Sequence, residues 1–250
     1  MYKKLFEGKK AAIFNLDEAM AKGLNDVKIS AFHKVMNEVF LGYIDPTPYC
    51  IPGYSLKTIW ESILYANELE KGKFNVKNLV EKTTNTYVEI LNDNEFAIEP
   101  MEGFWEFFAE LTEDYNYKTA LISNLPKPVV EKLSDKLEVA GIFDVVLSNE
   151  KMKEELPKIY KKALKKLKTR AKNTISFEGS VPGVSAANKS KVDVFVLWDM
   201  KTRKSFFGDK VKEFSLDYTS YPGNINRTYE EYLAESVKGG LEDKKQRAEI

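Results

Sequence analysis

The sequence predicts an α/β protein with a Rossmann-like parallel sheet core, helices on both faces of the sheet, and a small helical cap inserted after the first strand. Two patterns support this prediction. After residue 100, short apolar runs alternate with amphipathic helical stretches, which is typical of a parallel sheet. Between about residues 28 and 96, apolar side chains recur at helical spacing without strand alternation. A length of 250 residues accommodates one core and a smaller insert.

The elements follow in a simple order. Residues 11–14 (AAIF) form a short apolar run of the kind that makes a buried parallel strand. The helical stretch 28–96 comes next, interrupted by a loop rich in proline and glycine at 45–53. The remaining elements are predicted as helix 104–111, strand 117–124, helix 129–137, strand 143–147, helix 159–167, strand 174–177, a helix that opens at 184–187, and strand 192–197.

These elements divide the chain into three parts. Residues 1–17 and 97–221 form the α/β core, residues 18–96 the helical cap, and residues 222–250 a charged C-terminal extension. The extension is either a solvated terminus or a docking segment for a partner, with Tyr229, Tyr232 and Leu233 as its apolar side.

Composition excludes several classes of function. Lys plus Arg and Asp plus Glu are equal at 38 each, so there is no basic excess of the kind that binds nucleic acid. A single cysteine and a single histidine exclude an internal disulfide, a His/Cys metal centre and a histidine-based triad. No apolar run is long enough for membrane insertion. Without a recognisable targeting signal, we expect a cytoplasmic protein, with the mitochondrial matrix as the alternative.

Polar side chains gather where the predicted strands end. In parallel α/β sheets the ligand crevice lies at the carboxyl ends of the strands. The residues at those ends are Asn15, Asp17, Ser123, Asn124, Glu178 and Gly179. The sequence therefore predicts a site at this edge of the sheet.

Four segments carry a family pattern in the correct order. Residues 12–19 (AIFNLDEA) stand where the pattern has a strand ending in Asp-x-Asp-Gly-Thr, and residues 121–124 (LISN) match a strand ending in Ser-Asn. Residues 157–160 (PKIY) match Pro-x-x-Ile-Tyr, and residues 177–187 (FEGSVPGVSAA) match an acidic pair followed by Ser-x-x-Gly-Val-x-Ala-Ala. With the turn at 100–103 (PMEG), the chain resembles the beta-phosphoglucomutase-like branch of the haloacid dehalogenase (HAD) superfamily over about residues 8–215.

The resemblance implies a damaged catalytic site. In the family the first aspartate of the first motif is the nucleophile, and here it is Asn15, which cannot form the aspartyl phosphate. The second aspartate, the family's general acid/base, is kept as Asp17. The Gly and Thr that follow are replaced by Glu18 and Ala19.

The resemblance also implies weakened phosphate and metal sites. The remnant phosphate-binding residues are Ser123, Asn124 and Lys153, although the register leaves open whether Lys153 or Glu154 occupies the position of the family's lysine. The remnant metal ligands are Asp17 and Glu178, because Gly179 lacks the expected carboxylate. We therefore expect no cofactor, with weakly bound Mg²⁺ as the alternative.

Three functions are compatible with these observations. The leading hypothesis is a catalytically inactive HAD-like protein that acts as a structural or interaction subunit, with protein partners in a larger assembly or as a homo-oligomer. Aromatic residues of the cap are candidate contact residues: Tyr43, Tyr49, Tyr54 and Trp60. The alternatives are a Mg-dependent phosphatase or phosphomutase acting on a small phosphorylated metabolite, and a phosphometabolite sensor without hydrolysis.

Overall fold

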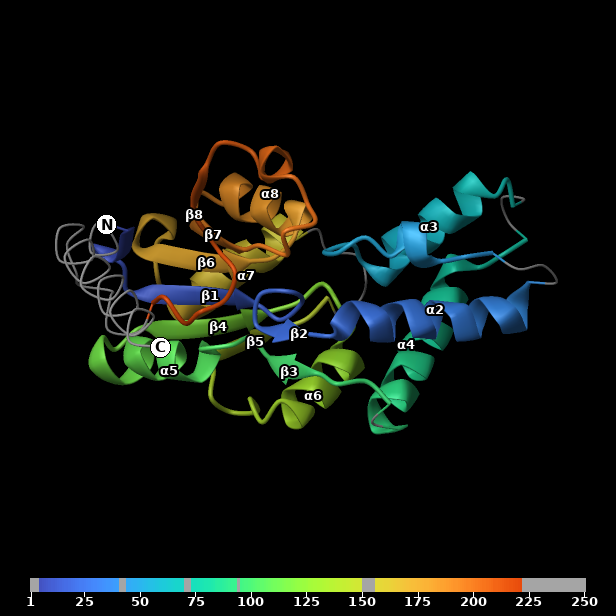
Figure 1. The fold of residues 1–250 in the computed structure, drawn as a ribbon, viewed down its shortest axis with the longest axis horizontal. Helices are drawn as coiled ribbons and strands as arrows, with labels where there is room; N and C mark the ends of the chain where they lie inside the picture. The colour runs from blue at the N-terminus through green and yellow to red at the C-terminus, as the bar shows by residue number, and fades with distance from the viewer. Residues whose placement is uncertain (1–4, 41–43, 70–72, 94, 150–155, 222–250) are drawn as a thin grey trace, which may run out of the picture.

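A six-stranded parallel sheet forms the centre of the protein, as seen in a computed structural model that describes residues 5–40, 44–69, 73–93, 95–149 and 156–221 (Figure 1). The strand order is β5-β4-β1-β6-β7-β8. The strands are β1 (Ala11–Asn15), β4 (Lys118–Ile122), β5 (Val145–Leu147), β6 (Thr174–Glu178), β7 (Asp193–Leu197) and β8 (Val211–Ser215). The predicted fold class is confirmed.

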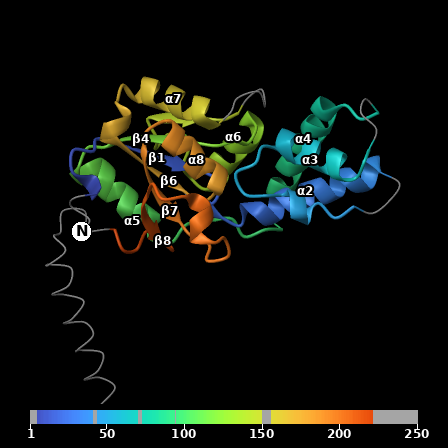
Figure 2. The same ribbon diagram turned by 90° about the horizontal axis from the view of Figure 1, so that it is seen from above.

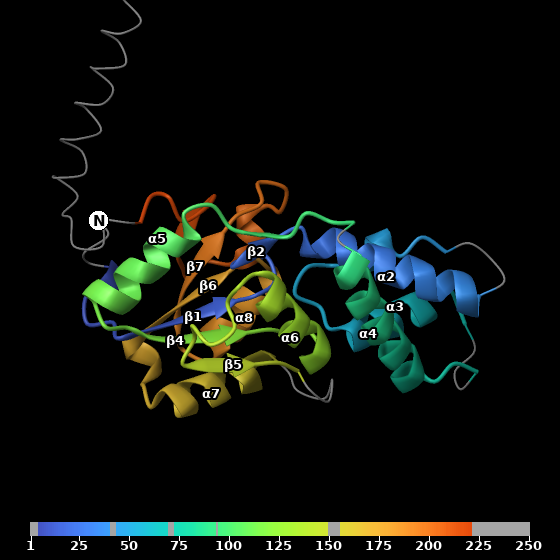
Figure 3. The same cartoon turned by 90° about the horizontal axis from the view of Figure 1, so that it is seen from below.

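Helices cover both faces of this sheet (Figures 2 and 3). One face carries α5 (Phe104–Ala109), which continues into a π-helical turn at Glu110–Asp114, and α6 (Lys127–Lys136). The other carries α7 (Leu156–Leu167) and α8 (Val181–Lys189). Because side chains alternate along a strand, Phe14 of β1 joins the core under α5 and α6, whereas Ile13 joins the core under α7 and α8.

Aromatic rings fill the core beneath α5. Phe14 and Phe177 stack with their ring centroids 4.9 Å apart, and Phe107 stacks on Tyr218 at 5.3 Å. The Tyr218 hydroxyl donates a hydrogen bond to the Ala19 carbonyl at 2.9 Å. This aromatic packing fixes the end of β1, and therefore the loop that carries Asp17 and Glu18, against the rest of the core.

The cap lies between two short strands that pair antiparallel, β2 (Ala21–Lys22) and β3 (Glu99–Pro100). Its helices are α2 (Leu24–Val39), α3 (Leu56–Ala66) and α4 (Val76–Asp93). Trp60 is completely buried among them, and its indole N–H donates to Thr83 Oγ1 at 2.9 Å. Packing inside the cap therefore accounts for Trp60, and its candidacy as a partner contact is wrong. Tyr43 lies outside the described residues.

Two features were absent from the sequence prediction. β8 extends the sheet beyond β7, but its residues are only partly buried, so they lack the apolar run that marks the central strands. The β2–β3 pair is too short to produce a periodic pattern. Single 3₁₀ turns occur at Thr47–Tyr49, Ala171–Asn173 and Lys204–Phe207. Within the described part of the chain, no helix is both long and apolar enough to cross a membrane.

Candidate functional site

The carboxyl ends of β1, β4 and β6 bring four of the predicted residues together. Asn15 ends β1, Ser123 follows β4 and Glu178 ends β6, while Asp17 lies two residues beyond β1. All four side chains are buried. Lys153 lies outside the described residues, so the ambiguity between Lys153 and Glu154 stays open.

Asn15 is bound to Glu178. The Asn15 Nδ2 group donates to Glu178 Oε2 at 2.7 Å, and the Tyr160 hydroxyl donates to Glu178 Oε1. Burial raises the pKa of Glu178 to about 8, against the opposing effect of these two hydrogen bonds. Burial therefore favours the neutral acid form of Glu178, and both oxygens of the side chain are held by hydrogen bonds.

Ser123 is also engaged. Its hydroxyl donates to Asp17 Oδ2 at 3.0 Å and accepts the Leu125 N–H at 3.0 Å. The Asp17 N–H donates to Asn15 Oδ1 at 3.1 Å, so Asn15 and Ser123 orient Asp17 from both sides. Burial raises the pKa of Asp17 above its usual value, although the Lys28 charge and the Ser123 hydrogen bond act in the opposite direction.

A buried lysine of the cap completes the cluster, and sequence reasoning missed it. Lys28 of α2 is 1% exposed, and its Nζ atom lies 4.0 Å from Glu18 Oε1. Burial raises the pKa of Glu18 to about 7, and the Lys28 charge is the main opposing effect. A signal was present in the sequence, because Lys28 lies one turn after Leu24 and one turn before Phe32 on the apolar side of this helix.

The Glu18 backbone lies so close to Gly179 that each position restricts the residue allowed at the other. Glu18 adopts a left-handed backbone conformation with φ of 71°, which suits the glycine of the family pattern better than a residue with a Cβ. A Cβ atom on Gly179 would lie 2.3 Å from the Glu18 carbonyl oxygen. An aspartate at position 179 therefore requires the 17–19 loop to move, so restoring one missing motif residue does not restore the geometry.

The residues at the metal position implied by the family resemblance do not fit Mg²⁺. Asn15 directs an amide N–H, not an oxygen, toward Glu178, and Gly179 contributes no carboxylate. The described residues contain no group of three or more His, Cys, Asp or Glu side chains arranged to hold a metal. Asp17 Oδ1 and both Glu18 carboxylate oxygens are buried without a hydrogen-bond partner among the described residues, and the neighbouring charge that compensates them is the Lys28 ammonium.

The cap is closed over this cluster. Asn124 donates from Nδ2 to the Gly53 carbonyl of the cap at 3.1 Å and accepts a hydrogen bond from Asn149 at 2.7 Å. A Cβ atom on Gly53 would lie 2.3 Å from Ser180 Oγ, so the cap loop packs closely against the Ser180 side chain of the core. The predicted phosphate-binding residue Asn124 therefore makes a contact between cap and core.

A cleft of about 460 Å³ remains at the boundary between cap and core. It is lined by Tyr54 and Lys57 of the cap and by Asn124 and Lys189 of the core, among others. Asn15, Asp17, Ser123 and Glu178 are not part of its lining. The cleft thus reaches the rim of the cluster and not its carboxylates.

Comparison with known families identifies the fold independently. A family model described as haloacid dehalogenase-like hydrolase matches residues 12–197. The chain belongs to this family. Among curated protein sequences, nothing matches the HAD-like chain.

Solved structures share the fold at low identity. CbbY from Rhodobacter sphaeroides, in complex with phosphate, is 18% identical over 84% of this chain and 95% of its own, with a TM-score of 0.72. A beta-phosphoglucomutase from Clostridium difficile is 18% identical over 93% and 99% of the two chains, with a TM-score of 0.68. A HAD hydrolase from Entamoeba histolytica is 18% identical over 89% of this chain and 96% of its own, with a TM-score of 0.67. The resemblance to the HAD superfamily is confirmed, and the chain shares its fold with a beta-phosphoglucomutase.

Proposed function

We propose that this HAD-like chain has no hydrolase activity and serves as a structural or interaction subunit of a larger protein assembly. The observation that carries the proposal is Asn15. It stands at the position of the nucleophilic carboxylate, and its amide is hydrogen-bonded to Glu178 at 2.7 Å. In another hydrolase, removal of the nucleophile lowers turnover by about six orders of magnitude.

Three further contacts support the proposal. Lys28 of the cap supplies a fixed positive charge beside the Asp17 and Glu18 carboxylates. A side chain at position 179 would collide with the Glu18 backbone, so the carboxylate of the family pattern has no room there. Asn124 forms a hydrogen bond between core and cap, and the cleft that it lines does not reach the carboxylates. Together these contacts favour a rigid closed unit, which suits a protein whose surface carries the function.

A phosphatase assay tests the absence of catalysis. The purified chain and its Asn15→Asp variant are incubated with p-nitrophenyl phosphate and Mg²⁺, and both phosphate release and acid-stable acyl phosphate are measured. We expect neither protein to exceed the buffer rate, because Glu18, Gly179 and Lys28 still obstruct the site after Asn15 is reverted. Turnover by the parent chain, or strong activation by Asn15→Asp alone, contradicts the proposal.

Native size tests the subunit role. Gel filtration of lysate from the natural source, followed by mass spectrometry of the co-eluting proteins, is expected to place the chain in a large particle of defined composition. Elution as a free monomer rejects the subunit role.

A phosphometabolite sensor would differ from a structural subunit in a thermal-shift assay. Inorganic phosphate or sugar phosphates would raise its melting temperature without being hydrolysed.

A further inference from the structure

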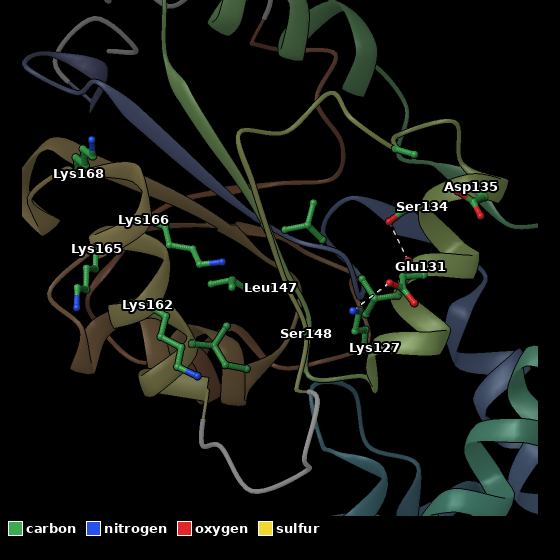
Figure 4. A pocket seen from close by; sticks show the side chains of 14 residues that line it. Lys127, Glu131, Ser134, Asp135, Leu147, Ser148, Lys162, Lys165, Lys166 and Lys168 are labelled. Carbon is green, nitrogen blue, oxygen red and sulfur yellow. Dashed lines mark hydrogen bonds and ion pairs between the residues drawn. The ribbon is translucent and has the colours of Figure 1, made fainter.

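The sheet has an open edge beside a groove of about 960 Å³ (Figure 4). Among the described residues, β5 is the terminal strand of the sheet and pairs only with β4. α6 lies on one face of the sheet and α7 on the other, and residues of both helices line the groove together with Val146 and Leu147 of β5. The groove therefore follows the edge of the sheet and has one helix on each side.

The outer edge of β5 offers backbone hydrogen-bonding groups. The Leu147 carbonyl accepts the Ser123 N–H at 2.9 Å, so the N–H and C=O of Leu147 point toward β4. Because these groups alternate along a strand, the N–H and C=O of Val146 point toward the groove. Val146 is 42% exposed, and β5 (VVL) contains no charge and no proline to protect its edge.

The two walls of the groove differ in charge. Lys165, Lys166 and Lys168 are exposed on the α7 side, and no carboxylate of the described residues forms an ion pair with them. Figure 4 shows Lys166 pointing toward β5. The α6 wall carries Glu131 and Asp135 instead. One wall is therefore cationic and the other contains carboxylates.

The α6 wall is nearly neutral near its centre. Lys127 lies 3.5 Å from Glu131 in an i,i+4 ion pair, and Val130 of the same helix is only 2% exposed. An occupant with uniform negative charge meets the Asp135 carboxylate on this side. A nucleic-acid strand is disfavoured for that reason, because its phosphates repel this carboxylate.

We propose that this groove binds an extended acidic segment of a partner protein, which adds as a further strand to β5. In an extended segment, alternate side chains point to opposite sides. Acidic side chains on one side then face the lysines of α7. Apolar side chains on the other side lie beside Val146, which is 42% exposed and whose side chain is on the α6 side because Val145 and Leu147 join the core under α7 and α8, while the partner's backbone bonds to the Val146 backbone. This is strand addition at a sheet edge, in which the backbone gives affinity and the alternate side chains give specificity.

The inference rests on the proposed function, because it names the surface through which an interaction subunit would bind its partner. The two ideas fail separately. If the chain elutes in a large particle but its groove binds no peptide, only the groove proposal is rejected. If the chain hydrolyses phosphate esters, the proposed function is rejected, whatever the groove binds.

Peptide binding tests the groove on the full chain. The probe is a fluorescein-labelled peptide of alternating pattern, Thr-Glu-Val-Glu-Val-Glu-Thr, and binding is followed by fluorescence anisotropy. The matched control peptide, Thr-Val-Glu-Glu-Glu-Val-Thr, has the same composition and charge without the alternation. We expect saturable binding of the alternating peptide and at least tenfold weaker binding of the control.

Matched variants locate the site. The double variant Lys165→Glu/Lys166→Glu is expected to lower the affinity for the alternating peptide more than tenfold and to make binding less dependent on salt. Lys158→Glu/Lys161→Glu makes the same charge change at exposed positions of α7 that do not line the groove, and is expected to leave affinity within twofold. Val146→Pro removes the N–H that faces the groove and is expected to weaken binding while the circular-dichroism spectrum stays unchanged.

Four outcomes overturn the proposal. They are equal binding of the two peptides, equal loss in both lysine variants, tighter binding of a twelve-nucleotide oligothymidylate than of the alternating peptide, and self-association that is abolished by Lys165→Glu/Lys166→Glu. The last two identify a nucleic acid or a second copy of the chain as the occupant.

Discussion

The buried cluster at the strand ends and the groove beside β5 use the same kinds of residue in opposite ways. Lys28, Asp17 and Glu18 are enclosed between cap and core, where their charges offset one another. Lys165 and Lys166 stand exposed on α7, and the groove beside them has room for an extended chain. A charge enclosed with its counter-charges acts on stability, whereas an exposed charge beside a free strand edge is available for recognition.

The largest expected effect breaks the buried cluster. Lys28→Met removes the ammonium and leaves Asp17 and Glu18 buried without a compensating charge, so we expect the free energy of unfolding to fall by about 3–5 kcal/mol. Urea denaturation measures this loss. The double variant Lys28→Met/Glu18→Gln is expected to recover part of it, since one carboxylate is then neutral. A loss below about 1 kcal/mol for Lys28→Met contradicts the electrostatic role of Lys28.

An intermediate effect concerns the pH dependence of stability. The pKa of Glu178 is about 8 in the folded state and has an ordinary value of 4.5, so between these values the folded state binds a proton that the unfolded chain releases. This stabilisation is fully present below about pH 4.5 and is lost as the pH rises through 8, at about 1.4 kcal/mol per pH unit for each proton. Urea titrations at pH 5 and pH 8 should show the fall.

The Glu178→Gln variant is the matched control for this effect. Glutamine keeps a hydrogen-bonding side chain of the same length beside Asn15 and Tyr160 but does not titrate, so the fall in stability from pH 5 to pH 8 should become smaller. Glu18 has a pKa of about 7 and contributes in the same direction, which leaves a residual slope in the variant. An unchanged slope would show that Glu178 does not titrate in this range.

The smallest expected effect is on the stability of groove variants. Lys165→Glu/Lys166→Glu changes exposed charges in the last turn of α7, so the free energy of unfolding should change by about 1 kcal/mol or less. The same urea titration used for Lys28 measures it. A loss as large as that of Lys28→Met would mean that these lysines support the fold, and it would remove the distinction between the two regions.

The sequence by itself determined the parallel sheet, the position of the cap and the polar residues that gather at the strand ends. These features depend on local periodicity and on motif residues at strand ends, both of which can be read along one chain. Asn15, Asp17, Ser123 and Glu178 were found in this way, and the structure places them together.

Only the tertiary structure decided what surrounds those residues. Lys28 is one buried lysine on an apolar helix face, and its counter-charges come from a loop of the core. The close approach of Gly53 to Ser180, and of Gly179 to Glu18, depends on how distant segments pack. The groove at β5 follows from strand order, since sequence patterns do not show which strand lies at an edge. Short-range periodicity specifies an element and its buried face, but contacts between distant elements are decided by how the whole chain packs.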